Sequence, residues 1–117
     1  MKKTTAAHFA LFKKEVQFWI DKWGLHQWET LFKHEPFNDD RAGIGHNLCG
    51  RSATFFLSME WGDVTPPTDA AIKATAKHEA IELLLAEVYT MAKSRFVTDD
   101  ELLAAHHALV RRLEKWL

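Results

Sequence analysis

The strongest constraint on this chain is a long helical pattern that runs from about residue 69 to residue 92 and contains the segment KHEAIELLL, residues 77–85. At about 3.6 residues per turn, His78 and Glu82 are neighbours on one face of this helix. Further positions on the same face carry apolar side chains: Ala71, Ala74, Ile81, Leu85, Tyr89 and Ala92. The spacing therefore predicts two polar groups within an apolar stripe, where a carboxylate needs a cation, a metal or several hydrogen-bond donors.

His78, Glu79 and Glu82 form the pattern His-Glu-x-x-Glu. This pattern is close to the helical zinc motif His-Glu-x-x-His, with a carboxylate in place of the second imidazole. Glu79 is expected about a quarter-turn aside, at the border of the apolar stripe. Two interpretations remain open at this point: a metal site that uses His78 and Glu82 as ligands, and a core histidine held by an ion pair.

The composition indicates a single globular domain, residues 1–117, with 47% hydrophobic and 26% charged residues. A net charge of -1 argues against a dominant nucleic-acid surface, because phosphate binding needs a clustered excess of Lys and Arg. Cys49 is the only cysteine, which excludes a disulfide framework and a four-cysteine zinc site. The sequence shows no signal peptide and no membrane span, so we expect a cytoplasmic protein.

The segments before residue 69 predict one helix and three strands. Thr4 or Thr5 can cap an amphipathic helix that ends at Gly24 in a left-handed conformation. Its apolar positions recur at helical spacing: Phe9, Phe12, Val16, Trp19, Ile20 and Trp23. Alternating patterns over residues 25–34, 41–47 and 52–61 predict strands joined by short connections. Such an order favours an antiparallel meander with one face covered by helices.

The last helix begins at a capping box formed by Thr98 and Glu101. Its apolar stripe contains one histidine: Leu102, His106, Leu109, Val110, Leu113 and Leu117. His107 lies about 100° away from His106, at the border of this stripe. The predicted fold class is therefore α+β, with an N-terminal helix, a three-stranded antiparallel meander, the motif helix and a C-terminal helix.

Three segments in this order resemble the small phage- and prophage-encoded zincin-like metallopeptidase domains, which are distant relatives of the SprT-like proteins. Residues 18–28 are similar to that group's aromatic helix end, turn and Trp-bearing strand. Residues 77–85 are similar to His-Glu-x-x-His followed by leucines, and residues 107–114 to the helix that carries the third metal ligand. Together the segments imply a minimal zincin-like fold over roughly residues 10–117.

The resemblance also implies a ligand set, because the group would have His at position 82 and Glu at position 107. This chain has Glu82 and His107, so the two ligand types are exchanged and a set of two His and one Glu around Zn²⁺ is preserved. Resemblance favours His107 as the third ligand, whereas helix phase favours His106. The competing explanation for Glu82 is that this chain is a degenerate copy of such a domain, which lost its second histidine because it no longer binds Zn²⁺.

Two functions follow from these alternatives. The first is a zinc-dependent peptidase, in which the metal lowers the pKa of a water towards about 7 and Glu79 accepts its proton. The free edge of the meander would then bind an extended peptide substrate. The second is a non-catalytic interaction module with a peptide or protein partner, derived from the same scaffold without its metal.

Overall fold

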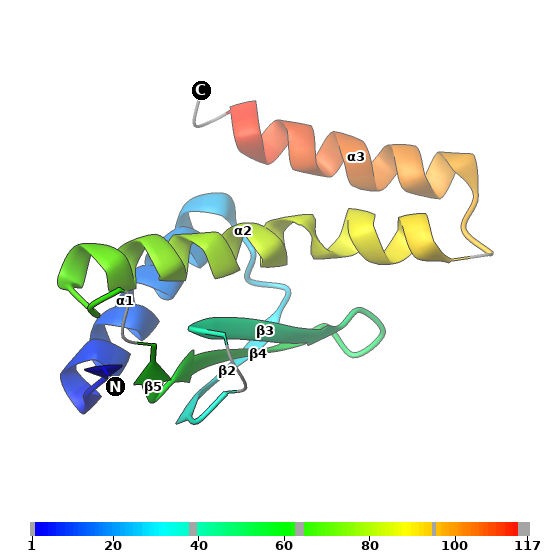
Figure 1. Cartoon of the computed structure of the whole chain (residues 1–117). Coiled ribbons are helices and arrows are strands. Elements are labelled where there is room, and N and C mark those ends of the chain that lie inside the picture. Colours follow the sequence, from blue (N-terminus) through cyan, green and yellow to red (C-terminus); the bar gives the residue numbers. More distant parts are fainter. Residues whose placement is uncertain (1, 38–39, 63–64, 95, 115–117) are drawn as a thin grey trace.

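The computed structural model describes residues 2–37, 40–62, 65–94 and 96–114. The elements follow one another as β1 (Lys2–Lys3), α1 (Ala6–Trp23), β2 (Glu29–Glu35), β3 (Ala42–Asn47), β4 (Ser52–Ser58), β5 (Glu60–Trp61), α2 (Asp69–Lys93) and α3 (Asp99–Glu114). The chain is thus α+β, as predicted, and α2 lies between the sheet and α3 (Figure 1). None of the described helices is both long and apolar enough to cross a membrane.

Local sequence signals set the ends of the helices. The Thr5 side chain accepts a hydrogen bond from the backbone N–H of His8 at the start of α1. Gly24 ends α1 at φ 64°, in the left-handed region where a Cβ would add strain. Thr98 and Glu101 form the predicted capping box, because the Thr98 hydroxyl accepts from the Glu101 N–H and the Glu101 carboxylate accepts from the Thr98 N–H. These predictions are confirmed.

The three-stranded sheet has the order β2-β4-β3, which differs from the expected antiparallel meander. β4 pairs in parallel with β2, with Phe32 opposite Phe55, and antiparallel with β3, with Ile44 opposite Phe55. The physical reason lies in β4, which buries its alternate residues Ala53, Phe55 and Leu57 completely or nearly so. The most apolar strand occupies the centre of the sheet, where both neighbours and the helices cover it.

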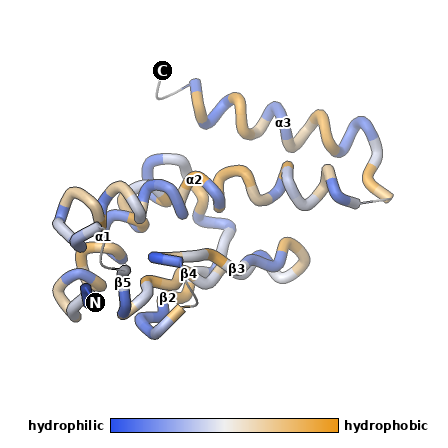
Figure 2. The backbone as a smooth tube through the Cα atoms, viewed as in Figure 1, coloured by the Kyte–Doolittle hydropathy of each residue, from blue (hydrophilic) through white to orange (hydrophobic). Residues whose placement is uncertain are grey.

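One hydrophobic core joins α1, α2 and the helix-facing side of the sheet. Its largest wholly buried apolar members come from every layer: Trp61, Phe12, Phe55, Leu25, Leu57, Ile72, Leu83 and Val16. Figure 2 shows hydrophobic segments in α1, α2 and the sheet where these elements meet. The apolar positions predicted for α1 are either buried or packed against this core.

α2 faces the core with a different side from the one predicted. Its buried residues are Ile72, Ala76, Glu79, Ala80, Leu83, Leu84 and Ala86. The expected stripe is the exposed side instead, with Ile81 37%, Leu85 41% and Tyr89 58% exposed. α2 therefore carries apolar residues on two sides, and the side with Ala76 and Ala80 is buried because small residues let α1 approach closely.

α3 packs more loosely than the other helices. Ala105 is its one buried residue within the described range 99–114, and Leu109 and Leu113 lie against the core. The Arg112 Nε donates to the Trp23 carbonyl oxygen at 2.9 Å, which ties the end of α3 to the end of α1. Leu117, the last position of the predicted stripe, lies outside the described residues.

β1 and β5 form a two-stranded antiparallel pair that anchors the N-terminal segment next to β2. The Thr4 hydroxyl donates to the Ser58 carbonyl at 2.7 Å. The Thr4 Oγ1 also lies 2.7 Å from the His34 Nε2. Because the one hydrogen of the hydroxyl is donated to Ser58, the His34 Nε2 must be the donor in this second hydrogen bond. The His34 ring also stacks on Phe9 at 4.9 Å.

We expect His34 to make the protein less stable in mild acid. Burial, followed by the nearby charge of His8, lowers the pKa of His34 below its usual 6.5. The unfolded chain then binds a proton at a higher pH than the folded chain does, so stability falls once the pH drops below about 6.5. Urea unfolding at pH 7.5 and 5.5 should show a smaller pH effect in His34→Gln than in wild type. His107→Gln is the control, and an equal reduction there would contradict this role.

Candidate metal centre

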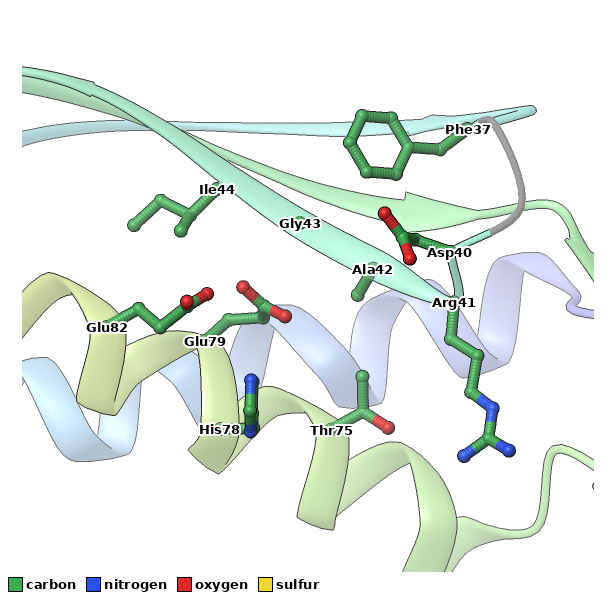
Figure 3. Close-up of a pocket in the computed structure, with 10 residues that line it drawn as sticks. All are labelled: Phe37, Asp40, Arg41, Ala42, Gly43, Ile44, Thr75, His78, Glu79 and Glu82. Carbon is green, nitrogen blue, oxygen red and sulfur yellow. The ribbon is translucent and has the colours of Figure 1, made fainter.

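A cleft of about 640 Å³ opens between α2 and the start of β3. Its lining residues come from both walls: Phe37, Asp40, Arg41, Ala42, Gly43, Ile44, Thr75, His78, Glu79 and Glu82. Figure 3 shows the carboxylates of Glu79 and Glu82 directed towards the β3 wall, with His78 beside them. The motif of α2 thus lies in an open cleft rather than in the interior.

Gly43 shapes the β3 wall of this cleft. A Cβ at this position would collide with the Phe37 ring, which packs directly against the strand. Phe37 in turn stacks on Phe56 of β4 with the ring centres 5.0 Å apart. These contacts fix the start of β3 and hold Asp40 and Arg41 at the end of the cleft.

His78, Glu79 and Glu82 form the one group of potential metal ligands found among the described residues. A ligand atom from each lies within 4.8 Å of the others. His78 and Glu82 are exposed at the cleft, whereas Glu79 is 5% exposed. The Glu79 Oε2 is buried and has no hydrogen-bond partner. A buried carboxylate oxygen without a donor is destabilising, so this atom marks the place where a cation would be stabilised.

The environment of Glu79 favours its neutral form. Burial raises the pKa of Glu79 to about 8, and the hydrogen bond and charge of Glu82 and the charge of Asp40 act in the same direction. Three carboxylates therefore line one cleft, and none of them forms an ion pair with a described Lys, Arg or His. The Glu79 carboxyl group stays protonated at neutral pH unless a positive charge replaces the proton.

The residues present fit a divalent metal ion. One imidazole and two carboxylates from successive turns of one helix supply nitrogen and oxygen ligands of the kinds that Zn²⁺ and Mn²⁺ accept. The unpartnered Oε2 of Glu79 is a ligand atom that nothing else in the fold uses. Glu79, expected from the sequence to be a proton acceptor beside the metal, lies within the ligand group itself.

His106 and His107 do not belong to this group. Both are exposed on α3, with ring centres 6.0 Å apart, and His106 lines a separate cavity with Val88 and Ala92 of the second half of α2. Neither candidate for the third ligand is therefore grouped with His78 and Glu82. Sequence reasoning did not identify Asp40, whose position after a turn and before a glycine-containing strand was its only signal.

Comparisons of the chain with protein-family models, with curated proteins and with solved structures gave no match. The resemblance to zincin-like domains therefore stays a prediction from the sequence.

Proposed function

We propose that the protein is a divalent-metal-dependent hydrolase that cleaves peptide bonds, with His78, Glu79 and Glu82 as the metal ligands. The observation that carries this proposal is the Glu79 Oε2, buried and unpartnered at the wall of an open cleft. Leaving such a group unsatisfied costs about 1–3 kcal/mol, and more if it is charged. A fold that keeps this arrangement in a solvent-accessible cleft is well suited to hold a cation there.

In this proposal the side chains of the cleft have two roles, metal binding and proton acceptance. A bound divalent ion supplies Lewis acidity, which polarises a carbonyl and makes a water more acidic. His78 and Glu82 would hold such an ion from the exposed side of the cleft, and Glu79 would hold it from the buried side. Asp40 stands on the β3 wall outside the ligand group, so it is the carboxylate placed to accept a proton from water.

The free edge of β3 is the observation that favours a peptide as the substrate. Within the described three-stranded sheet, β3 is paired with β4 alone, so its other edge presents N–H and C=O groups that can pair with an extended chain. This edge borders the same cleft as the ligand group, through Ala42, Gly43 and Ile44. Backbone pairing there would place a peptide bond near the metal ligands.

A non-catalytic binding module is the second candidate, favoured by the exposed apolar side of α2. Leu85 and Tyr89 line one cavity and Leu103 of α3, which is 52% exposed, lines the next. The two cavities share Val88 and Ala92, so these residues form one apolar surface next to the cleft. In that case a proton shared by Glu79 and Glu82 takes the place of the metal, and the cleft serves recognition alone.

Metal titration distinguishes the two candidates. Calorimetric titration of chelator-treated protein with Zn²⁺ and with Mn²⁺ should show one bound equivalent. Elemental analysis of freshly purified protein should find a near-stoichiometric metal. The metal-loaded protein should also cleave an unfolded substrate such as casein, as followed by mass spectrometry. Absence of metal binding in both measurements would assign the cleft to the second candidate.

A further inference from the structure

Arg41 lies exposed at the end of the cleft, where its side chain and its backbone are both held by neighbouring residues. Its Nη2 donates to the Thr65 Oγ1 at 2.6 Å, and its guanidinium lies over the Trp61 ring at 5.4 Å. Its backbone oxygen accepts from the Trp61 Nε1 at 3.2 Å and from the Ser58 N–H at 2.8 Å. Figure 3 shows the guanidinium beside Thr75, at the opposite end of the cleft from Glu82.

The guanidinium keeps most of its donors available. No acidic side chain in the described segments forms an ion pair with Arg41, although Asp40, Glu79 and Glu82 line the same cleft. Arg41 is also the one Lys or Arg among the described lining residues. The planar fork of N–H donors of an arginine is suited to a carboxylate, which it can bind through two parallel hydrogen bonds.

A second, more apolar cavity of about 630 Å³ continues the cleft in the other direction. The two cavities share Ile44 and Glu82. The continuation is lined mainly by α2: Leu85, Ala86, Val88, Tyr89 and Ala92, with Ile44 and His46 from β3. The result is one groove along β3, with an arginine at one end, the ligand group in the middle and an apolar wall at the other end.

We propose that this groove binds the C-terminal end of an extended peptide, with the terminal carboxylate on Arg41 and apolar side chains on Leu85 and Tyr89. The inference rests on the proposed function, since it names the substrate class of the same cleft. Arg41 precedes β3, so a peptide that ends there runs from the Asn47 end to the Ala42 end. The peptide is therefore antiparallel to β3, the orientation that gives the stronger strand pairing.

Peptide binding in the absence of metal tests the proposal. The probes are a dye-labelled six-residue peptide of Leu, Val and Ala with a free C-terminus and the same peptide with a C-terminal amide. Fluorescence anisotropy in EDTA should show the free acid binding about tenfold more tightly, as expected for a charge-assisted hydrogen-bonded pair. Arg41→Gln should make the two affinities equal, whereas Arg111→Gln, a change at an exposed arginine of α3, should leave the ratio unchanged.

The apolar part of the groove has its own variants. Leu85→Ser and Tyr89→Ser should weaken both probes by the same factor, about fivefold or more, because each removes apolar burial without touching Arg41. Leu31→Ser is the matched control, since Leu31 is an exposed leucine on β2 outside both cavities. Circular dichroism melting of each variant verifies its fold, and Arg41→Lys retains the charge if Arg41→Gln is unstable.

Equal affinities of wild type for the free acid and the amide would overturn the proposal, as would an undiminished ratio in Arg41→Gln. Failure of both probes to bind would overturn it as well. Metal titration of the same preparations separates these results from the proposed function. Metal binding without carboxylate-dependent peptide binding refutes this inference alone, and carboxylate-dependent peptide binding without metal refutes the hydrolase alone.

Discussion

Glu79→Gln should stabilise the metal-free protein strongly at alkaline pH. Glu79 has a pKa of about 8 in the folded chain against an ordinary value of 4.5, so the folded state binds its proton more tightly than the unfolded state. The stability that this proton contributes is fully present below pH 4.5 and is lost as the pH rises to about 8. The slope is at most about 1.4 kcal/mol per pH unit, and the total loss is on the order of 5 kcal/mol.

Urea unfolding in EDTA at pH 5 and pH 8.5 measures this effect. The free energy of unfolding of wild type should fall between the two values by several kcal/mol more than that of Glu79→Gln, because glutamine does not ionise there. Glu29→Gln, at an exposed position of β2, should retain the wild-type slope. An identical slope in wild type and Glu79→Gln would show that Glu79 is not buried in the manner described.

Removing any one of the three proposed ligands should weaken metal binding by about 100-fold or more, or about 2.7 kcal/mol. The variants are His78→Ala and Glu82→Ala, which delete a ligand group, and Glu79→Gln, which replaces a carboxylate by a neutral amide. His106→Ala and His107→Ala are the matched controls, because both side chains are exposed and lie outside the group. Calorimetric titration with Zn²⁺ and Mn²⁺ gives each dissociation constant.

Thermal unfolding gives an independent measure of the same effect. A metal present at about 100 times its dissociation constant stabilises the fold by about 2.7 kcal/mol, which corresponds to roughly 10 °C in a domain of this size. The wild type and both α3 controls should show this shift, and the three ligand variants should not. Loss of the shift in His107→Ala would support the ligand set that the resemblance implies. Normal metal binding with lost turnover in Glu79→Gln would return Glu79 to the role of proton acceptor.

The local signals in the sequence were sufficient for much of the fold. Thr5, Gly24 and the Thr98–Glu101 pair marked helix ends because caps depend on one or two neighbouring residues. Strand pairing depends on residues far apart, and the alternating patterns do not encode it. The higher apolar content of β4 was the available signal for its central position, and the two glycines of β3 were the signal for an edge.

The candidate site was predictable in part for a similar reason. His78, Glu79 and Glu82 are close together because one helix fixes their spacing, whatever the rest of the chain does. The side of α2 that is buried depends on its partner α1. His78 and Glu82, predicted to lie within the buried stripe, are therefore exposed, and Glu79, predicted at its border, is buried. Asp40 and Arg41 reach the cleft through long-range contacts, such as the packing of Phe37 against Gly43 and the hydrogen bonds of Arg41 to Ser58 and Trp61.

The central place of β4 has a consequence for the order of folding. Both edge strands bind to residues 52–58, so the three-stranded sheet cannot begin to form until β4 has been synthesised. β3 and β4 are joined by the short segment 48–51, whereas the pairing of β2 with β4 closes a longer loop that contains β3. Loop-closure entropy favours the shorter connection. The β3–β4 hairpin should therefore form first, and β2 should then pair with the free edge of β4. The β3 wall of the cleft should thus form before α2 packs against it to complete the site.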